Sequence, residues 1–384
     1  MYITDNAGLR DVVARARTYP VVGLDTEFMR ERTYYARLCL IQLGTAEFSA
    51  IIDPLVIDDL TPLCELLADP AVVKIFHAGG QDLEIFFRAC NVATAPLFDT
   101  QVAATLAGFP QQVGYGALVS EVLGTKLDKG DSFTDWAKRP LTDTQVEYAL
   151  NDVRYLPGLY DELTRQLNEG GRMAWLAKDF ARMEDPATYN VVPEDQWRRV
   201  KRVSVLNRRQ LGVAREVAAW REREAMRRDQ PKRWVLGDES IIEIARRMPE
   251  TPEALLSIRG VSEKVGRQAA AGLVAAVAAA LVVPDEDLPV LEKRRRPAGD
   301  VDAAVDLMVA VVRRRAKERG VAMPLLASRD DLERLAGGDR DGSPLLEGWR
   351  AEMVGNELVA LLEGRIELRL DDGDLVIVER PESV

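Results

Sequence analysis

Hydrophobic residues follow two different spacings in the first half of the chain. Short runs of apolar and β-branched residues predict strands, and between them an apolar residue at every third or fourth position predicts helices. The strand segments are 21–28, 37–43, 47–53 and 72–78, and the helical segments are 6–17, 62–69 and 81–90. From Asp99 to about Asn168 the pattern is mainly helical. Three consecutive strands followed by alternating strands and helices predict an α/β fold with a mixed sheet.

The second half of the chain is dominated by helical spacing. One helical block covers 207–281, a second covers about 301–362, and two short strand-like segments follow around 371–373. The residues between the blocks are rich in proline and charge, which is typical of a linker. Because the blocks have similar length and similar apolar spacing, they indicate a duplicated small helical module. We therefore expect an α/β domain over 1–190, all-α domains over 200–284 and 300–384, and a linker over 285–299.

The charge of the chain is unevenly distributed. There are 51 Lys and Arg against 62 Asp and Glu, a formal net charge of −11. Residues 198–233 alone hold 13 Lys and Arg against 4 Asp and Glu, which is +9 and leaves −20 for the rest. This surplus favours a cationic face that follows a phosphate backbone. The alternative is a solvated helix whose arginines pair with Glu216, Glu222 and Glu224. Trp220 and Trp234 are interpreted as core residues in both cases.

Histidine and cysteine exclude several classes of metal site. His77 is the only histidine, so no site can take two histidines from one chain, and Cys39, Cys64 and Cys90 are too few for a four-thiolate zinc site. An odd number of separated cysteines suits free, buried thiols in a reducing cytoplasm. The N-terminus lacks the features of a signal peptide. The longest apolar run, 269–283, is shorter than the ~20 residues that a bilayer requires. We expect a cytoplasmic protein with no membrane association.

Two carboxylates interrupt the first apolar strand segment. Asp25 and Glu27 are two residues apart and therefore point to the same face of a strand. Neighbouring carboxylates in an apolar setting repel each other and lose hydration, and a bound divalent cation would offset both costs. The alternative is that one of them caps a turn while the other pairs with Arg30 or Arg32. Buried acids need a partner, which favours the metal site.

Other acidic residues indicate a metal site only when they are considered together with this pair. Asp82 starts a helix, and by itself it would be an acid favoured by the helix dipole. Tyr148 and Asp152 are four residues apart and share a helix face, although a solvated acid beside a core tyrosine would show the same spacing. Asp99 precedes an apolar helix and is more simply an N-cap. Four converging carboxylates would suit two Mg²⁺ or Mn²⁺ ions about 3.5–4 Å apart, which activate water for phosphodiester hydrolysis.

Three motifs carry a family resemblance. In chain order they read DTEF, HAGGQDLEIF and YALNDVRYL, and they resemble the DEDD superfamily of 3′-5′ exonucleases. The tyrosine four residues before the last aspartate is typical of the DEDDy subgroup, because the related subgroup has a histidine near that place and His77 lies outside the last motif. The surrounding sequence of residues 1–165 is similar to the ribonuclease D family. Both helical blocks resemble the HRDC domain, and the clearer copy begins at WVLGDESIIEIARRM.

The resemblance implies a role for each matching residue. Asp25, Glu27 and Asp152 would hold the ion that binds the attacking water. Asp25 would also bridge to a second ion, which Asp82 would support through water. Tyr148 would hydrogen-bond the attacking water. The cofactors implied are therefore two divalent metal ions, Mg²⁺ or Mn²⁺.

The resemblance also implies a fold and a substrate. The first domain would have a ribonuclease-H-like fold, and the enzyme would be a 3′-5′ exoribonuclease that releases nucleoside 5′-monophosphates. Expected substrates are tRNA precursors or structured RNA with single-stranded 3′ tails, bound by a monomer without a nucleotide cofactor. The Thr26 backbone and the Phe28 ring would contact the terminal nucleotide. Two alternatives stay open: a 3′-5′ DNA exonuclease with the same acids, and a nucleic-acid-binding adaptor with an idle site.

Overall fold

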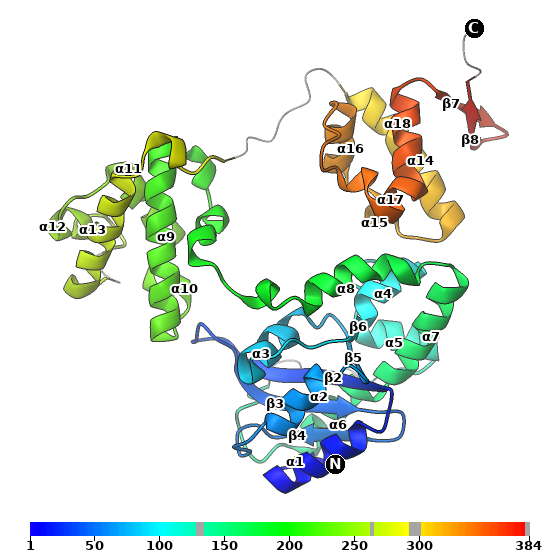
Figure 1. Ribbon diagram of the computed structural model, residues 1–384, viewed down its shortest axis with the longest axis horizontal. Helices are drawn as coiled ribbons and strands as arrows, with labels where there is room; N and C mark the ends of the chain where they lie inside the picture. Colours follow the sequence, from blue (N-terminus) through cyan, green and yellow to red (C-terminus); the bar gives the residue numbers. More distant parts are fainter. Residues whose placement is uncertain (128–133, 262–264, 292–300, 381–384) are drawn as a thin grey trace.

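The computed structural model describes the chain except residues 128–133, 262–264, 292–300 and 381–384 (Figure 1). Most of the predicted linker, 285–299, therefore lies outside the described residues, and the domain boundaries stay predictions. Within the described ranges no helix is both long enough and apolar enough to cross a membrane.

A six-stranded mixed sheet forms the centre of the N-terminal part (Figure 1). Its strand order is β1-β4-β3-β2-β5-β6. β2, β3 and β4 form an antiparallel meander, while β5 and β6 continue the sheet parallel to β2 and β1 pairs in parallel with β4. The strands span Tyr2–Ile3, Val21–Met29, Arg37–Gly44, Ser49–Ile52, Val73–Phe76 and Leu97–Asp99, in the order β1 to β6. The α/β prediction with a mixed sheet is confirmed.

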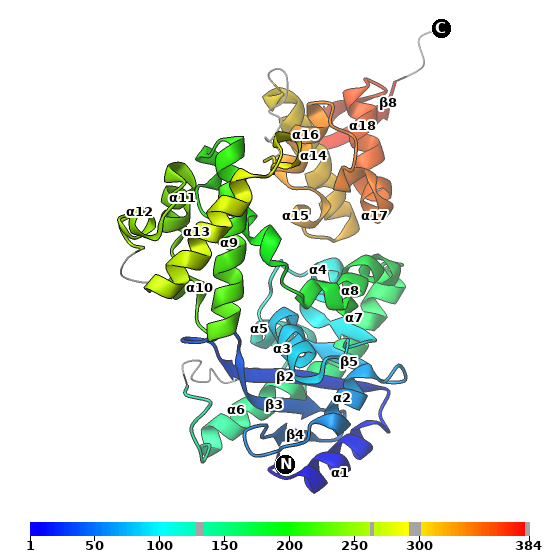
Figure 2. The same cartoon turned by 60° about the vertical axis from the view of Figure 1, so that its left-hand side comes forward.

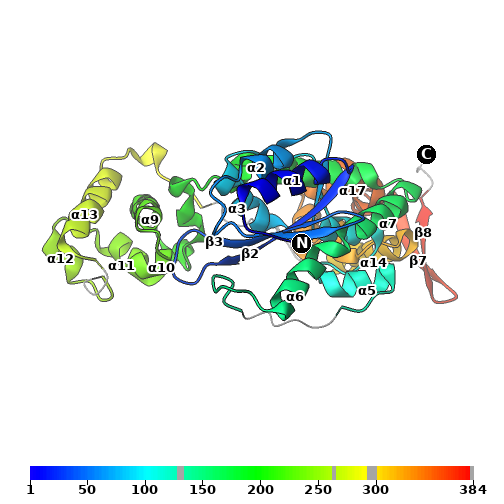
Figure 3. The same ribbon diagram turned by 90° about the horizontal axis from the view of Figure 1, so that it is seen from below.

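Helices cover both faces of this sheet. Figure 3 shows α1, α2 and α3 on one face and α5 and α6 on the other. The helices α1 to α8 span Asn6–Ala16, Thr61–Ala68, Gly80–Cys90, Thr100–Ala107, Tyr115–Leu123, Asp143–Arg154, Leu156–Glu169 and Ala177–Glu184. Leu24 of β2 and Leu43 of β3 are fully buried in the core under α1 to α3. Because side chains alternate along a strand, Asp25 and Glu27 point to the opposite face.

The cysteine expectation is wrong for two of the three residues. Cys64 on α2 and Cys90 on α3 form a disulfide, with their Cα atoms 5.3 Å apart, and Cys39 is the buried free thiol. The two residues are 26 positions apart in sequence. Only the packing of α2 beside α3 on the same sheet face brings them together, and a sequence pattern does not contain that contact.

The helical part of the chain has two separate hydrophobic cores. The first, around Trp197 and Leu273, is enclosed mainly by α9 to α13, which span Arg208–Arg228, Lys232–Val235, Asp238–Arg247, Pro252–Leu256 and Arg267–Leu281. The second is enclosed mainly by α14 to α18, which span Asp302–Arg319, Met323–Leu326, Arg329–Ala336, Gly348–Arg350 and Asn356–Leu362. A hairpin follows, formed by β7 (Ile366–Asp371) and β8 (Asp374–Glu379). We refer to the two units as the first and second helical modules.

Short helical turns join these units. They are 3-10 helices except for η7, which is a π-helix. In the order η1 to η7 they span Met173–Leu176, Pro186–Tyr189, Pro193–Arg199, Val203–Val205, Asp285–Asp287, Pro344–Leu346 and Ala351–Gly355.

Each helical module contacts a different part of the N-terminal α/β domain (Figure 2). The first module meets the β2–β3 loop, where the Tyr34 hydroxyl donates to Glu222 at 2.6 Å and the Tyr35 amide donates to Asp229 at 3.0 Å. The second module lies near α4 and α8, where the indole rings of Trp175 and Trp349 stack with centroids 4.9 Å apart. The β2–β3 loop thus supports the first module directly beside the strand that carries Asp25 and Glu27.

Trp234 corrects the expectation that both tryptophans of the basic segment are core residues. Trp220 packs partly buried against the first module's core, but Trp234 is 53% exposed. Trp234 lies in the short helix α10, where the neighbouring Val235 and Leu236 are buried instead. Consecutive residues of a short helix point in different directions, so only some of them can face the core.

Candidate active site

Two glycines make room for the acidic pair on the α6–α7 face of the sheet. Gly23 on β2 pairs with Gly44 on β3. A Cβ at Gly23 would lie 2.8 Å from the Cβ of Leu156, and a Cβ at Gly44 would collide with the Val153 carbonyl. The junction of α6 and α7 can therefore lie directly on the sheet beside Asp25. This close approach brings the C-terminal turn of α6 to the strand.

Asp82 reaches the same region from α3. It is buried in the first turn of that helix, 7% exposed. The Thr26 hydroxyl donates a hydrogen bond to the Asp82 carboxylate. The backbone amides of Ala78 and Gly79 donate to Asp99, which also caps α4 as predicted. Asp99 thus fixes the turn between β5 and α3 from which Asp82 projects.

Tyr148 and Asp152 lie on α6, one helical turn apart. A capping box of Thr142 and Gln145 starts this helix, and α6 packs on β2, β3 and β4. Burial raises the pKa of Tyr148 above its ordinary value, and the charges of Asp152, Glu27 and Asp25 raise it further. The phenol therefore keeps its proton at neutral pH and can donate a hydrogen bond.

Burial raises the pKa of all four carboxylates, and the charges of neighbouring acids raise the pKa of Asp25 and Glu27 further. Burial raises the pKa of Asp25 well above its ordinary value, and the charges of Asp82, Asp152 and Glu27 add to this effect. Burial, followed by the charges of Asp152 and Asp82, raises the pKa of Glu27 to about 8, and burial raises that of Asp152 to about 7. Burial also raises the pKa of Asp82. Apart from Asp82, the acids keep part of their surface accessible, as a site that admits water requires.

This donor set fits hard divalent cations. Carboxylate oxygens are the ligands that Mg²⁺ and Mn²⁺ prefer, and a cation would offset both the burial and the mutual repulsion of these groups. In the part of the chain that the structure describes, no group of three or more His, Cys, Asp or Glu side chains is placed so that it could hold a metal ion as the side chains now stand. The fit therefore rests on burial and shared charge, and the side chains would adjust on binding.

Three further residues surround the acids: Thr26 and Phe28, which were predicted, and Tyr115, which was not. Phe28 is half-buried just after a β-bulge at Glu27, and the Thr26 side chain is engaged with Asp82. Tyr115 was not predicted, yet its hydroxyl donates to the Asn151 carbonyl at 2.9 Å and accepts from the Tyr155 amide at 3.3 Å. It thereby holds the end of α6, and no motif in its sequence surroundings indicated this role.

His77 has a packing role that uses both ring nitrogens. Nδ1 lies 2.9 Å from the Thr100 hydroxyl and Nε2 lies 3.0 Å from the Val113 carbonyl oxygen. The ring also makes an edge contact with Tyr115, with centroids 5.5 Å apart. Burial lowers the pKa of His77, which favours the neutral ring.

A mixed sheet with acids on β2, α3 and α6 and a tyrosine one turn before the last acid defines the DEDDy class of 3′-5′ exonucleases. Comparison with protein families agrees, because a 3′-5′ exonuclease family matches residues 1–168 and the HRDC domain matches residues 210–277. These matches, together with relatives that are more than 40% identical over nearly the whole chain, show that the chain belongs to the ribonuclease D family of 3′-5′ exoribonucleases. The HRDC match covers the first helical module, and the likeness of the second module to HRDC stays a prediction.

The relatives match this chain over nearly its whole length. Ribonuclease D of Granulibacter bethesdensis is 43% identical over 379 residues, 98% of this chain and 96% of the relative. Ribonuclease D of Gluconacetobacter diazotrophicus is 45% identical over 371 residues, 96% of this chain and 94% of the relative. The crystal structure of Escherichia coli RNase D, an exoribonuclease involved in structured RNA processing, superposes with a TM-score of 0.81 at 33% identity and covers 95% of this chain and 98% of its own.

Proposed function

We propose that this ribonuclease D hydrolyses RNA from the 3′ end with two divalent metal ions and releases nucleoside 5′-monophosphates. The observation that carries the proposal is a set of four carboxylates beside Tyr148, in which the charges of Asp82 and Asp152 raise the pKa of both Asp25 and Glu27. Asp25, Glu27 and Asp152 would hold one ion, and Asp25 with Asp82 would hold the other. When bound, the ions would lower the pKa of the attacking water and stabilise the leaving oxygen.

The side chains of this chain would orient the reaction. The protonated Tyr148 phenol would donate a hydrogen bond to the attacking water, which fixes its direction toward the phosphorus. The water oxygen forms the new bond to phosphorus as the bond from phosphorus to the 3′ oxygen breaks. The 3′ oxygen then takes a proton and stays with the shortened RNA. Thr26 and Phe28 would position the terminal nucleotide, Phe28 through its ring, because an aromatic ring stacks on any base.

Structured RNA with a single-stranded 3′ tail is the proposed substrate class, with tRNA precursors as the main example. The E. coli relative is described as acting in structured RNA processing, and the two helical modules would position such an RNA. We also propose that the enzyme acts as a monomer in the cytoplasm, because one chain supplies all the acids and both modules. The adaptor alternative is less favoured, since all five motif residues are present.

One assay tests this proposal and its alternatives. The protein is incubated with 3′-tailed RNA or DNA of matched sequence, with Mg²⁺, with Mn²⁺ or with EDTA, beside Asp25→Ala and the control Asp11→Ala on the exposed side of α1. We expect metal-dependent shortening of RNA from the 3′ end, lost in Asp25→Ala and kept in Asp11→Ala. Preferred cleavage of DNA would contradict the RNA substrate, and no cleavage of either substrate would leave the adaptor as the better explanation.

A further inference from the structure

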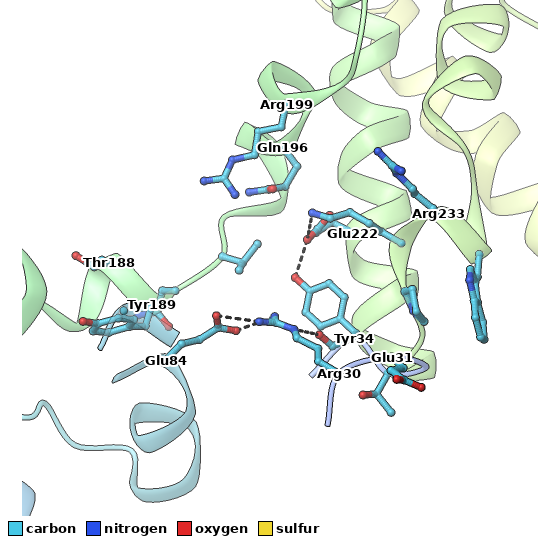
Figure 4. A pocket seen from close by; sticks show the side chains of 17 residues that line it. Arg30, Glu31, Tyr34, Glu84, Thr188, Tyr189, Gln196, Arg199, Glu222 and Arg233 are labelled. Carbon is cyan, nitrogen blue, oxygen red and sulfur yellow. Dashed lines mark hydrogen bonds and ion pairs between the residues drawn. The ribbon is translucent and has the colours of Figure 1, made fainter. Parts of the chain in front are cut away.

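A cavity of about 750 Å³ separates the exonuclease domain from the first helical module. The β2–β3 loop and the start of α3 form one wall, and the chain around η2 and η3 together with α9 and α10 forms the other (Figure 4). In Figure 4, Arg199 and Gln196 face the pair of Arg30 and Glu84 across this space. None of the five residues expected to act in catalysis lines the cavity, although Gly80 and Glu84 of the second motif do.

The position of the cavity connects it to the catalytic acids. β2 and β5 are parallel neighbours, and their carboxyl ends lead into the β2–β3 loop and into α3. Ligands of open α/β sheets bind outside the carboxyl ends of the strands. The same edge carries Glu27 near the end of β2 and Asp82 two residues after Gly80, which lines the cavity. A polynucleotide that crossed this edge from the acids would therefore reach the cavity.

Some of the charged side chains that line the cavity form ion pairs with one another, and others do not. Arg30 donates to both carboxylate oxygens of Glu84, at 3.2 and 2.9 Å, and Lys232 lies 3.2 Å from Glu222, so these two pairs are internally neutral. Among the described residues, no hydrogen bond, ion pair or ring contact engages the guanidinium of Arg199. Arg233 is exposed and its guanidinium extends from α10 (Figure 4).

An exposed aromatic ring accompanies these cations. Trp234 lines the cavity while 53% of its surface is accessible. The Trp234 ring is not needed for the hydrophobic core, because Val235 and Leu236 supply the buried contacts at this helix. Cationic groups that hold phosphates, interleaved with aromatic rings on which bases stack, are the recurring composition of single-strand binding sites.

We propose that this cavity binds the single-stranded RNA segment on the 5′ side of the nucleotide being removed. Arg199 and Arg233 contact backbone phosphates, and a base stacks on Trp234. The proposal rests on the proposed exoribonuclease function and assigns the first helical module, rather than the second, to the 3′ tail. Several other arginines of the basic segment are paired, including Arg227 and Arg228 with Glu224, so Arg199 is one of the cations of this segment that remain available to a phosphate.

Matched variants of neighbouring residues test the proposal. Arg199→Ala is compared with Arg198→Ala, because Arg198 lies on the same 3-10 helix, pairs with Asp195 and does not line the cavity. Trp234→Ala is compared with Trp234→Phe, which keeps a ring for stacking. Affinity is measured in EDTA with a fluorescent RNA duplex that carries a single-stranded 3′ tail and with a blunt duplex. Metal-dependent hydrolysis is measured on the tailed RNA and on a dinucleotide.

Loss of a stacking ring weakens binding by roughly 5- to 150-fold. We therefore expect Trp234→Ala to bind tailed RNA that much less tightly and Trp234→Phe to restore most of the affinity. Arg199→Ala should lower the salt dependence of binding, the slope of log K against log salt, by about one. Blunt duplex binding and dinucleotide hydrolysis should not change.

Two results would overturn the cavity proposal while the proposed function stands. One is equal binding of tailed RNA by Arg199→Ala, Arg198→Ala and the unaltered protein, together with no effect of Trp234→Ala. The other is an equal loss on the dinucleotide and on tailed RNA, because a dinucleotide is too short to need the cavity. If the unaltered protein hydrolyses neither RNA, the proposed function fails instead, and the binding measured in EDTA still decides whether tailed RNA uses the cavity.

Discussion

Thr26 on β2 donates its hydroxyl to the carboxylate of Asp82 on α3, 56 residues further along the chain. This hydrogen bond joins the strand that carries Asp25 and Glu27 to the helix that carries Asp82. It also helps to fix the orientation of a buried carboxylate that accepts hydrogen bonds from the backbone amides of Asp82 and Thr26 as well. β2 thus orients an acid on another element through a side chain that points away from the acidic pair.

Thr26→Val should weaken metal binding without unfolding the protein. The substitution keeps the shape of the side chain but removes the donor to Asp82, and loss of a group that orients a metal ligand typically costs 10- to 100-fold in metal affinity or activity. The measurement is hydrolysis of tailed RNA against Mg²⁺ concentration. Thr26→Ser keeps the hydroxyl and is the control. An unchanged Mg²⁺ dependence in Thr26→Val would contradict this role.

Arg139→Met should destabilise the fold by about 3–5 kcal/mol, because it leaves the buried Asp53 carboxylate charged and without its cation. The Arg139 guanidinium binds both carboxylate oxygens of Asp53, at 2.5 and 2.8 Å, and donates to the Cys39 carbonyl at 2.7 Å. Only 2% of the Asp53 side chain is exposed. The free energy of unfolding is measured by denaturant titration. The control is Arg165→Met, which breaks only exposed pairs and should leave the free energy of unfolding almost unchanged.

The local sequence pattern was sufficient to predict the strand that carries Asp25 and Glu27. Alternation along 21–28 places Asp25 and Glu27 on one face, and β2 has that arrangement, with Leu24 buried on the other face. Periodicity is a property of one segment, so it can be read without knowledge of the tertiary structure. The short strands β1 and β6 were missed because two or three residues show no period.

No local sequence pattern predicts that the acids from β2, α3 and α6 lie close together. Asp82 reaches the pair because β5 runs parallel to β2, and Asp152 does so because α6 lies on β2, β3 and β4. Both contacts depend on tertiary packing, and before the structure only the family resemblance connected them. The same reason explains the missed disulfide and the exposure of Trp234. The roles of the individual acids stay predictions that the variants above would test.

Lys74 should make the stability of the fold depend on pH above about 8. Its side chain is fully buried, its ammonium donates to the carbonyls of Asp69, Val72 and Ala95, and burial lowers its pKa from 10.5 to about 8. The pKa in the folded protein is thus lower than in the unfolded chain. Unfolding takes up a proton between pH 8 and 10.5, so the free energy of unfolding should rise with pH there, by up to about 1.4 kcal/mol per pH unit.

The comparison with Lys74→Met isolates this effect, because the variant has no proton to exchange at this position. We expect the difference in unfolding free energy between the two proteins to be constant below pH 8 and to change in favour of the lysine as the pH rises toward 10.5. The measurement is denaturant titration at a series of pH values. A difference that stays constant over the whole range would show that burial does not shift the Lys74 pKa.

Asp25→Asn should stabilise the metal-free protein while removing its activity. Asp25 is surrounded by Asp82, Asp152 and Glu27, and without a cation this cluster opposes folding through repulsion and lost hydration. An amide of the same shape relieves part of that cost, and we expect a gain of about 0.5–2 kcal/mol in EDTA. Mg²⁺ stabilises the folded state only where it binds, so it should raise the melting temperature of the unaltered protein and of the control Asp11→Asn, but much less that of Asp25→Asn. If Asp25→Asn melted lower than the unaltered protein in EDTA, the carboxylate would be a structural group of the fold rather than one held there for a cation.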